Sequence, residues 1–345
     1  MAGKVSQKPV YREYFRLFKK TFLLTSIIIF PCSVLADSLD ECINKGIRSA
    51  SPDTRVAEIK ADCDNSLLSD SLPEDEYSDN GVVKERIKYD QDHVLEPFTL
   101  MAHKPNYLLF AAYNDKGYNS EYAQVIDPDN EWRDTEAQFQ LSMKFPLLVN
   151  LLDDTFDIYA GYTNRSFWQI YGSDSSPFRE TNHEPEIWVQ FQPNWKLWGF
   201  TNTWNSFGVN HQSNGREEEL SRSWNRVFAW ITLEKGNLAM SVKPWYRVPE
   251  DLSDDDNPDI TDYMGHGEIS ASYLYNKHVF SALSRNNLES GFSKGTVELS
   301  WSFPLGDWPY LKGYIHWHSG YGESLIDYNT YANTIGIGIS LTDWL

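Results

Sequence analysis

The sequence predicts an all-β protein, a transmembrane antiparallel β-barrel of about 12 strands that follows a short N-terminal periplasmic extension. Three observations support this fold class. The N-terminus has the composition of an export signal, the segments after Pro97 alternate apolar and polar side chains, and aromatic side chains flank those segments. Aromatic residues make up 15% of the chain, although its mean hydropathy is negative.

Residues 1–36 have the composition of a signal peptide. Their basic side chains precede an apolar run that extends from Thr21 to Ala36. Val34 and Ala36 stand at the −3 and −1 positions of a cleavage site before Asp37. A retained membrane anchor is the alternative, but the short apolar run and its Val-Leu-Ala ending favour the signal peptide.

Residues 37–92 are predicted to form a polar periplasmic extension, because they are acidic and show little periodicity. Removal of the signal peptide leaves Cys42 and Cys63 as the two cysteines of an exported chain. Export favours a disulfide between them, worth roughly 3 kcal/mol, over two free thiols. Residues 93–345 are assigned to the barrel.

Strand periodicity begins near Pro97. In residues 137–145 every second side chain from Phe139 to Phe145 is apolar, and those between are polar. The same period of two recurs in residues 238–246, 297–303 and 333–341. A soluble sandwich would alternate in the same way. Export, even strand spacing and flanking aromatic side chains favour a membrane barrel, whose closure satisfies every backbone polar group.

Residues 210–226, NHQSNGREEELSRSWNR, combine strand periodicity with candidate catalytic side chains. His211 and Ser213 share one strand face with the apolar Val209, and Asn225 occupies the apolar face of the next strand. Polar side chains on a lipid-facing surface are costly, so they indicate function. The hairpin that joins the strands can bring His211 and Asn225 side by side.

These residue types suit nucleophilic hydrolysis. A histidine can accept the proton of a serine hydroxyl, and a neutral asparagine can hold the imidazole in one tautomer. The loop between the strands offers oxygen ligands of the kind that Ca²⁺ prefers, and the backbone N–H of Gly215 can stabilise an oxyanion. By composition alone, a solvated acidic loop beside a common His-x-Ser sequence is the simpler interpretation.

Longer motifs favour the catalytic interpretation. NHQSNG at 210–215, followed by SRSWNR at 221–226, resembles the signature of outer-membrane phospholipase A, the detergent-resistant phospholipase A family. The resemblance covers roughly residues 96–345 and includes further motifs. They are EPFTL at 96–100, SSPFRETN at 175–182, KPWY at 243–246, DNPDIT at 256–261, YMG at 263–265 and SGYGESLIDYN at 319–329.

The resemblance implies a 12-stranded barrel in the outer membrane of a Gram-negative bacterium. It also implies a calcium-dependent hydrolase of phospholipid and lysophospholipid acyl esters, with A1, A2 and lysophospholipase activity, active as a homodimer. Position by position, Ser213 matches the nucleophile and His211 the general base. Asn225 matches the residue that orients the histidine, and Gly215 matches the oxyanion-hole amide.

Calcium ligands also follow from the resemblance. They are Ser221, the carbonyl of Arg216 and Glu218, with Ser175 contributed by a second monomer. Glu218 stands where the family has an aspartate. Asn164 stands near the position where the family has a glutamine at the dimer interface, which leaves that polar contact in doubt.

Two other interpretations stay open, a non-enzymatic pore or structural barrel with a wide lumen, and a barrel enzyme with another substrate, such as a lipid A deacylase. A net charge of −19 excludes a nucleic-acid partner. DDDNPDITD at 254–262 lacks the Gly and distal Glu of an EF-hand, so we interpret it as an acidic turn. His316 and His318 share a strand face beside aromatic residues, which favours a structural role at the membrane interface.

Overall fold

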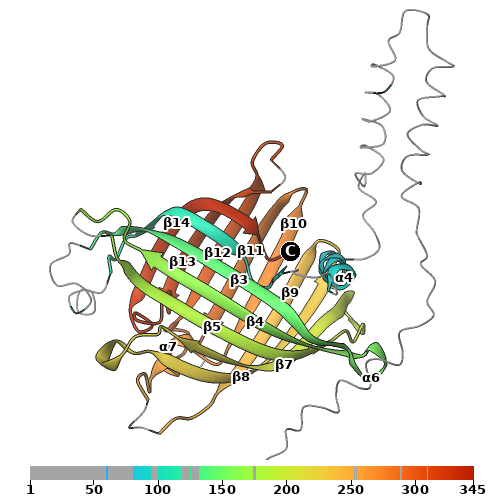
Figure 1. Ribbon diagram of the computed structural model, residues 1–345, viewed down its shortest axis with the longest axis horizontal. Coiled ribbons are helices and arrows are strands. Elements are labelled where there is room, and N and C mark those ends of the chain that lie inside the picture. Colours follow the sequence, from blue (N-terminus) through green and yellow to red (C-terminus); the bar gives the residue numbers. More distant parts are fainter. Residues whose placement is uncertain are drawn as a thin grey trace, which may run out of the picture. The chain divides into compact units, whose positions relative to one another are not determined.

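The computed structural model describes residues 60, 81–94, 100–118, 125, 132–173, 176–251, 253, 255–287, 290–308 and 310–345. The predicted signal peptide and the Cys42–Cys63 pair lie outside these residues, and so does Ser175. The chain divides into two units, and the helices and strands labelled in Figure 1 belong to the second, Ser78–Leu345.

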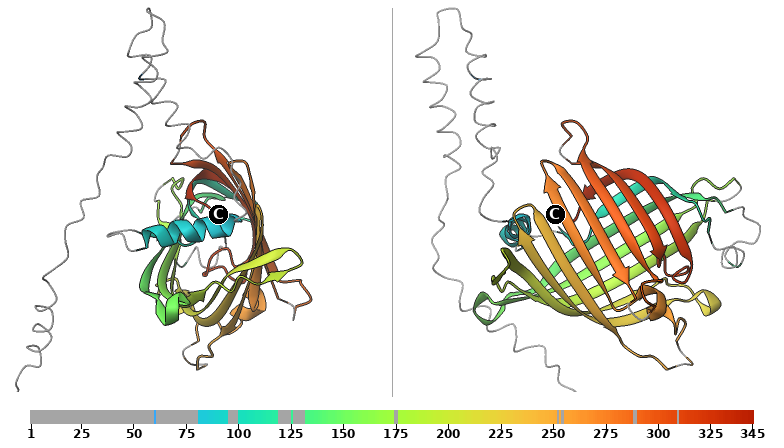
Figure 2. Two further views of the ribbon diagram at one scale, coloured as in Figure 1. Left: turned by 90° about the vertical axis from the view of Figure 1, so that its right-hand side faces the viewer. Right: turned by 180° about the vertical axis from the view of Figure 1, so that it is seen from behind.

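Fourteen strands of the described residues form a single antiparallel sheet. The twelve long strands, in chain order, are β2 (Asn106–Asn114), β3 (Thr135–Asn150), β4 (Phe156–Trp168), β5 (Phe178–Phe191), β7 (Phe200–Ser213), β8 (Ser223–Lys235), β9 (Leu238–Arg247), β10 (Gly267–Tyr275), β11 (His278–Asn286), β12 (Gly295–Pro304), β13 (Lys312–Tyr321) and β14 (Tyr331–Thr342). Each pairs with the next, and β14 pairs with β2 to close the barrel (Figures 1 and 2). Two short strands, β1 (Met101–Ala102) and β6 (Lys196–Leu197), pair with β3 and β7. The predicted fold class is confirmed.

The period of two places apolar side chains on the outer wall. In β14, Ile335, Ile337 and Leu341 are 55%, 57% and 61% exposed, whereas Gly336 and Ser340 are buried. Since a bilayer offers no hydrogen-bond partners, a closed sheet with an apolar outer wall is the form in which strands can cross it.

Polar and charged side chains fill the lumen. The Glu186 carboxylate lies 3.0 Å from the Lys243 ammonium and 3.1 Å from that of Lys104. Arg179 forms a second buried pair with Glu136, at 2.9 Å. Removing one partner of a buried ion pair costs about 3–5 kcal/mol, because the other charge is then left without compensation in the lumen. Side chains cross the lumen, which disfavours the wide pore of the alternative interpretation.

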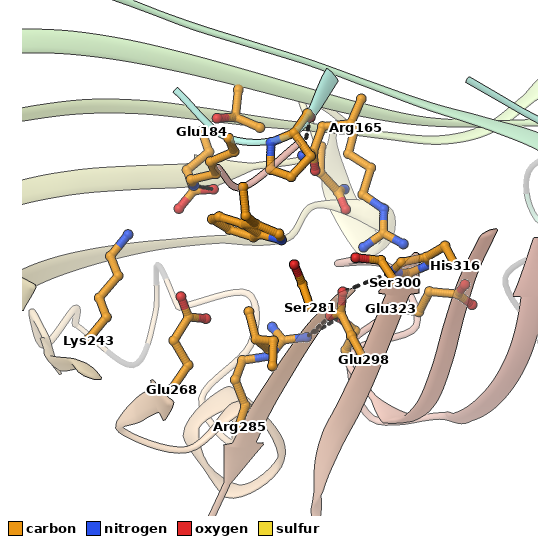
Figure 3. A pocket seen from close by; sticks show the side chains of 18 of the residues that line it. Arg165, Glu184, Lys243, Glu268, Ser281, Arg285, Glu298, Ser300, His316 and Glu323 are labelled. Carbon is orange, nitrogen blue, oxygen red and sulfur yellow. Dashed lines mark hydrogen bonds and ion pairs between the residues drawn. The ribbon is translucent and has the colours of Figure 1, made fainter. Parts of the chain in front are cut away.

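An internal cavity of about 160 Å³ remains between these networks (Figure 3). Glu298 lies on its wall, 3.2 Å from Arg285 and 3.2 Å from His316. His318, which is fully buried, lies 3.6 Å from the same carboxylate. The expectation that His316 and His318 lie at the membrane interface is therefore wrong. The register of β13 turns both side chains inward, where Glu298 pairs with them.

Short turns occupy one end of the barrel, and one of them contains the helix α6 (Leu151–Asp154). The helix α4 (Val82–His93) lies across this end, close to the C-terminus (Figure 2). Its Arg86 guanidinium donates to the carbonyl oxygens of Trp344, at 2.8 Å, and Ala102, at 3.1 Å. None of the helices in the described part of the chain is long and apolar enough to cross a membrane.

Longer loops gather at the opposite end. The β7–β8 loop contains the 3₁₀ helix η2 (Glu218–Leu220), and the β9–β10 loop contains the helix α7 (Ile260–Met264). The two loops are in contact, because the Ser223 N–H donates to Asn257 Oδ1 at 2.9 Å. Asn257 is fully buried, so this contact anchors the second loop against the first.

Candidate active site

The β7–β8 hairpin brings together two of the residues singled out in the sequence. His211 lies directly opposite Asn225 in the strand register, and Ser213 lies opposite Ser223. The His211 Nδ1 atom is 2.9 Å from Asn225 Oδ1. An amide oxygen only accepts hydrogen bonds, so Nδ1 carries the proton and Nε2 keeps a free lone pair.

This pair lies on the outer wall of the barrel, as the sequence predicted. Phe207 and Val209, which precede His211 on the same face of β7, are 61% and 52% exposed. Ser213 follows on that face, two residues along, with its Cα about 7 Å from that of His211. No hydrogen bond joins the Ser213 hydroxyl to the His211 imidazole within the described residues. Catalytic contacts of this kind commonly tighten only when substrate binds.

Asn225 has a second side-chain partner that the sequence did not predict. Its Nδ2 donates to Glu250 Oε1 at 2.9 Å. Glu250 belongs to the β9–β10 loop, whose start is held against β8 because the Val248 N–H donates to the Asn225 carbonyl oxygen at 2.8 Å. Asn225 therefore links the histidine to a carboxylate that lies 25 residues further along the chain.

The turn after Ser213 presents the backbone of Gly215. Gly215 has φ of 64°, a left-handed conformation that glycine adopts without strain. Asn214, which is buried, holds the turn. Its Oδ1 accepts from the N–H groups of Arg216, at 3.3 Å, and Arg222, at 3.0 Å, and its Nδ2 donates to the Leu220 carbonyl at 2.8 Å. No pattern in the sequence indicated this role of Asn214.

The structure describes some of the residues expected to provide oxygen ligands for calcium. Ser221 Oγ donates to the Asp256 carboxylate, so the acidic stretch 254–262 contributes a group beside Ser221 and is more than a solvated turn. The Arg216 guanidinium donates to the Arg179 carbonyl at 2.6 Å, which anchors the residue whose carbonyl is a predicted ligand. The side chain of Glu218 lies outside the described part of the structure.

The donor set at Ser221 suits a hard cation. It combines the Ser221 hydroxyl with the Asp256 carboxylate, and both are oxygen ligands of the kind that Ca²⁺ takes in proteins. No group of three or more His, Cys, Asp and Glu side chains with metal-binding geometry occurs among the described residues. A cation at this site would therefore need hydroxyl and carbonyl oxygens for part of its coordination.

The lumenal cavity is separate from this site. Its lining includes Arg165, Glu184, Lys243 and Glu268 (Figure 3), and none of Ser213, His211 and Asn225 belongs to it. Charged walls are unsuited to an acyl chain. A lipid substrate would instead meet the serine and histidine on the outer wall.

The fold and the site define an integral membrane β-barrel that carries serine, histidine and asparagine on its lipid-facing wall. The family model described as Phospholipase A1 matches residues 83–341, which is more than half of the chain. The chain belongs to the phospholipase A1 family.

Relatives and solved structures agree with this assignment. The Phospholipase A1 of Klebsiella pneumoniae is 41% identical over 254 residues, covering 73% of this chain and 85% of the relative. The structure of outer membrane phospholipase A from Escherichia coli has a TM-score of 0.67 and 39% identity, covering 72% of this chain and all of that one. The calcium-bound dimer of the Salmonella typhi outer membrane phospholipase has a TM-score of 0.67 and 38% identity, covering 72% and 94%. The protein is an outer-membrane phospholipase.

Proposed function

We propose that this protein hydrolyses the acyl esters of phospholipids and lysophospholipids in the outer membrane, as a calcium-dependent homodimer, with Ser213, His211 and Asn225 as its catalytic residues. The hydrogen bond between His211 Nδ1 and Asn225 Oδ1 carries the proposal, because it leaves Nε2 ready to accept a proton on the face that also bears Ser213.

The reaction follows from these positions. Ser213 Oγ attacks the ester carbonyl carbon while His211 Nε2 accepts the hydroxyl proton. The Asn225 amide oxygen holds the imidazole through Nδ1–H as positive charge develops on the ring. The Gly215 N–H donates to the oxyanion of the tetrahedral intermediate. His211 then protonates the departing alcohol, and water releases the fatty acid from Ser213 by the same steps in reverse order.

Calcium would be held at the Ser221 end of the loop. Ser221 Oγ, the Asp256 carboxylate beside it and the Arg216 carbonyl are the described groups of this chain that fit the cation. Glu218 and Ser175, the latter from a second copy, complete the proposed set. When bound, Ca²⁺ would polarise the ester carbonyl and offset the charge of the oxyanion. The calcium-bound relative from Salmonella typhi supports this part of the proposal.

A second copy would complete the substrate site. One convex barrel wall cannot enclose an acyl chain, whereas two apposed walls form a cleft. The wall beside Ser213 carries a polar cluster suited to such an interface. The Tyr162 hydroxyl lies 2.6 Å from His183 Nδ1, Asn164 Nδ2 lies 3.4 Å from the same atom, and His183 is the register partner of Ser213. The dimeric relative is consistent with this arrangement.

The test is fatty-acid release from phosphatidylethanolamine in detergent micelles, with Ca²⁺ and then with EDTA. We expect calcium-dependent release that Ser213→Ala abolishes. Ser284→Ala removes a hydroxyl from the outer face of β11 and serves as the matched control, which should retain activity. Full activity of Ser213→Ala would refute the assignment of the nucleophile. Equal release in Ca²⁺ and EDTA would refute the metal dependence.

A further inference from the structure

Glu250 is the one carboxylate that contacts the catalytic residues proposed above, among the residues that the structure describes. Its Oε1 accepts a hydrogen bond from Asn225 Nδ2 at 2.9 Å, while Asn225 Oδ1 lies 2.9 Å from His211 Nδ1. The three side chains thus form a continuous chain that runs from the imidazole through the amide to the carboxylate. Nothing in the general chemistry of a serine-histidine-asparagine site requires this fourth group.

The loop that carries Glu250 is anchored on both sides. Before it, Arg247 Nη2 donates to Asp255 Oδ1 at 2.6 Å, and Arg247 Nη1 donates to the Pro258 carbonyl at 3.1 Å. Asp255 Oδ1 also accepts from the Asn257 N–H at 3.0 Å. These bonds close the segment on itself, so Glu250 is presented to Asn225 by a braced loop.

The charge of Glu250 decides which way the amide points. An asparagine side chain can rotate to exchange its oxygen and its NH₂ group. An ionised carboxylate only accepts hydrogen bonds, so it holds the NH₂ group on its own side. The amide oxygen is then left facing His211 Nδ1, which must carry the proton. Nε2 is thereby kept as the basic nitrogen on the side available to Ser213.

We propose that Glu250 is a positioning residue for ester hydrolysis, which fixes the orientation of the Asn225 amide and, through it, the tautomer of His211. The proposal rests on the proposed roles of Ser213, His211 and Asn225. This role of Glu250 also explains why residue 225 is a neutral asparagine and not an aspartate. A carboxylate at position 225 would lie within hydrogen-bond distance of Glu250, and two carboxylates so close resist ionising together.

Kinetics of single variants give the first test, in full-length protein in calcium-loaded micelles. Glu250→Ala should lower kcat about tenfold, the effect of losing a hydrogen bond to a charged group, and leave KM nearly unchanged. Glu250→Gln keeps an acceptor oxygen but can also turn its NH₂ group toward Asn225, so it should recover only part of that loss. Asp251→Ala removes the same charge from the neighbouring exposed residue and should retain wild-type kcat.

A double-mutant cycle separates positioning from simple loop packing. Asn225→Asp should be strongly impaired, because the new carboxylate faces Glu250. Adding Glu250→Gln supplies an NH₂ donor to that carboxylate and should raise kcat by at least fivefold over the single Asn225→Asp variant, although each change alone is harmful. Equal folding of all variants is checked by heat-dependent gel mobility.

Each outcome decides the proposal. Wild-type kcat in Glu250→Ala would overturn it, and so would a double variant no more active than Asn225→Asp. A rise in KM or a loss of stability without a fall in kcat would reduce Glu250 to a packing residue. Failure of the underlying mechanism would be recognised separately, because Ser213→Ala and Asn225→Ala would then be active in the same assay.

Discussion

Replacing Asn214 should destabilise the β7–β8 loop and leave the stability of the barrel almost unchanged. Its buried side chain makes three hydrogen bonds within the turn after Ser213, to Leu220, Arg216 and Arg222. Each is worth about 0.5–1.5 kcal/mol, so Asn214→Ala should weaken the closed loop by about 1.5–4.5 kcal/mol. Even the lower figure increases the population of opened loop about tenfold.

The loss of stability should be confined to the β7–β8 loop and should not extend to the barrel. The turn carries the Gly215 amide and the Ser221 hydroxyl, so its opening should raise the calcium concentration for half-maximal fatty-acid release about tenfold or more. Local opening of this kind leaves the global unfolding of a strand network almost unchanged. We therefore expect the thermal midpoint of the barrel to shift by no more than a few degrees.

Asn237→Ala is the matched control. Asn237 lies in the β8–β9 turn at the opposite end, where its Nδ2 donates to the Leu274 carbonyl at 2.9 Å. The same substitution there should leave the calcium requirement unchanged. An unaltered calcium curve for Asn214→Ala, or a fall in barrel stability that accounts for all of the lost activity, would refute the reasoning.

Three further predictions concern the cation site, the outer wall and the lumen. Asp256→Asn should raise the calcium requirement in the same release assay while leaving release at saturating calcium close to wild type, and an unchanged requirement would remove Asp256 from the site. Ile337→Lys, in the middle of β14, should lower the free energy of unfolding in lipid by about 2–4 kcal/mol. Leu341→Lys, near the end of the same strand, should lower it by at most about 1 kcal/mol. Equal effects of the two substitutions would contradict the predicted position of the membrane. Glu186→Gln should destabilise the barrel by about 3 kcal/mol, because it leaves Lys104 and Lys243 with less compensation in the lumen, and denaturant unfolding would measure it.

The side chains proposed as catalytic lie on the apolar outer wall of the barrel. His211 and Ser213 continue the face of Phe207 and Val209, so a phospholipid in the bilayer can reach them without entering the lumen. This position explains why the filled lumen does not obstruct the proposed reaction. It also explains why completion of the site would require a second copy, since a lone wall leaves the acyl chain exposed.

The sequence by itself determined the strands and the face on which the site lies. Period-two alternation is a local property, because successive side chains of a strand point to opposite sides whatever the strand pairs with. His211 and Ser213 therefore had to share a face with Val209. Asn225 could also be anticipated, because a hairpin pairs residues on either side of a single loop.

Only the tertiary structure decided which groups support that site. Glu250 reaches Asn225, and Asp256 reaches Ser221, across 25 and 35 residues, because the β9–β10 loop folds back over the β7–β8 hairpin. The inward direction of His316 and His318 likewise depended on the register of β13 in the closed barrel. Such contacts follow from loop conformation and barrel closure, and neither is encoded in the spacing of neighbouring residues.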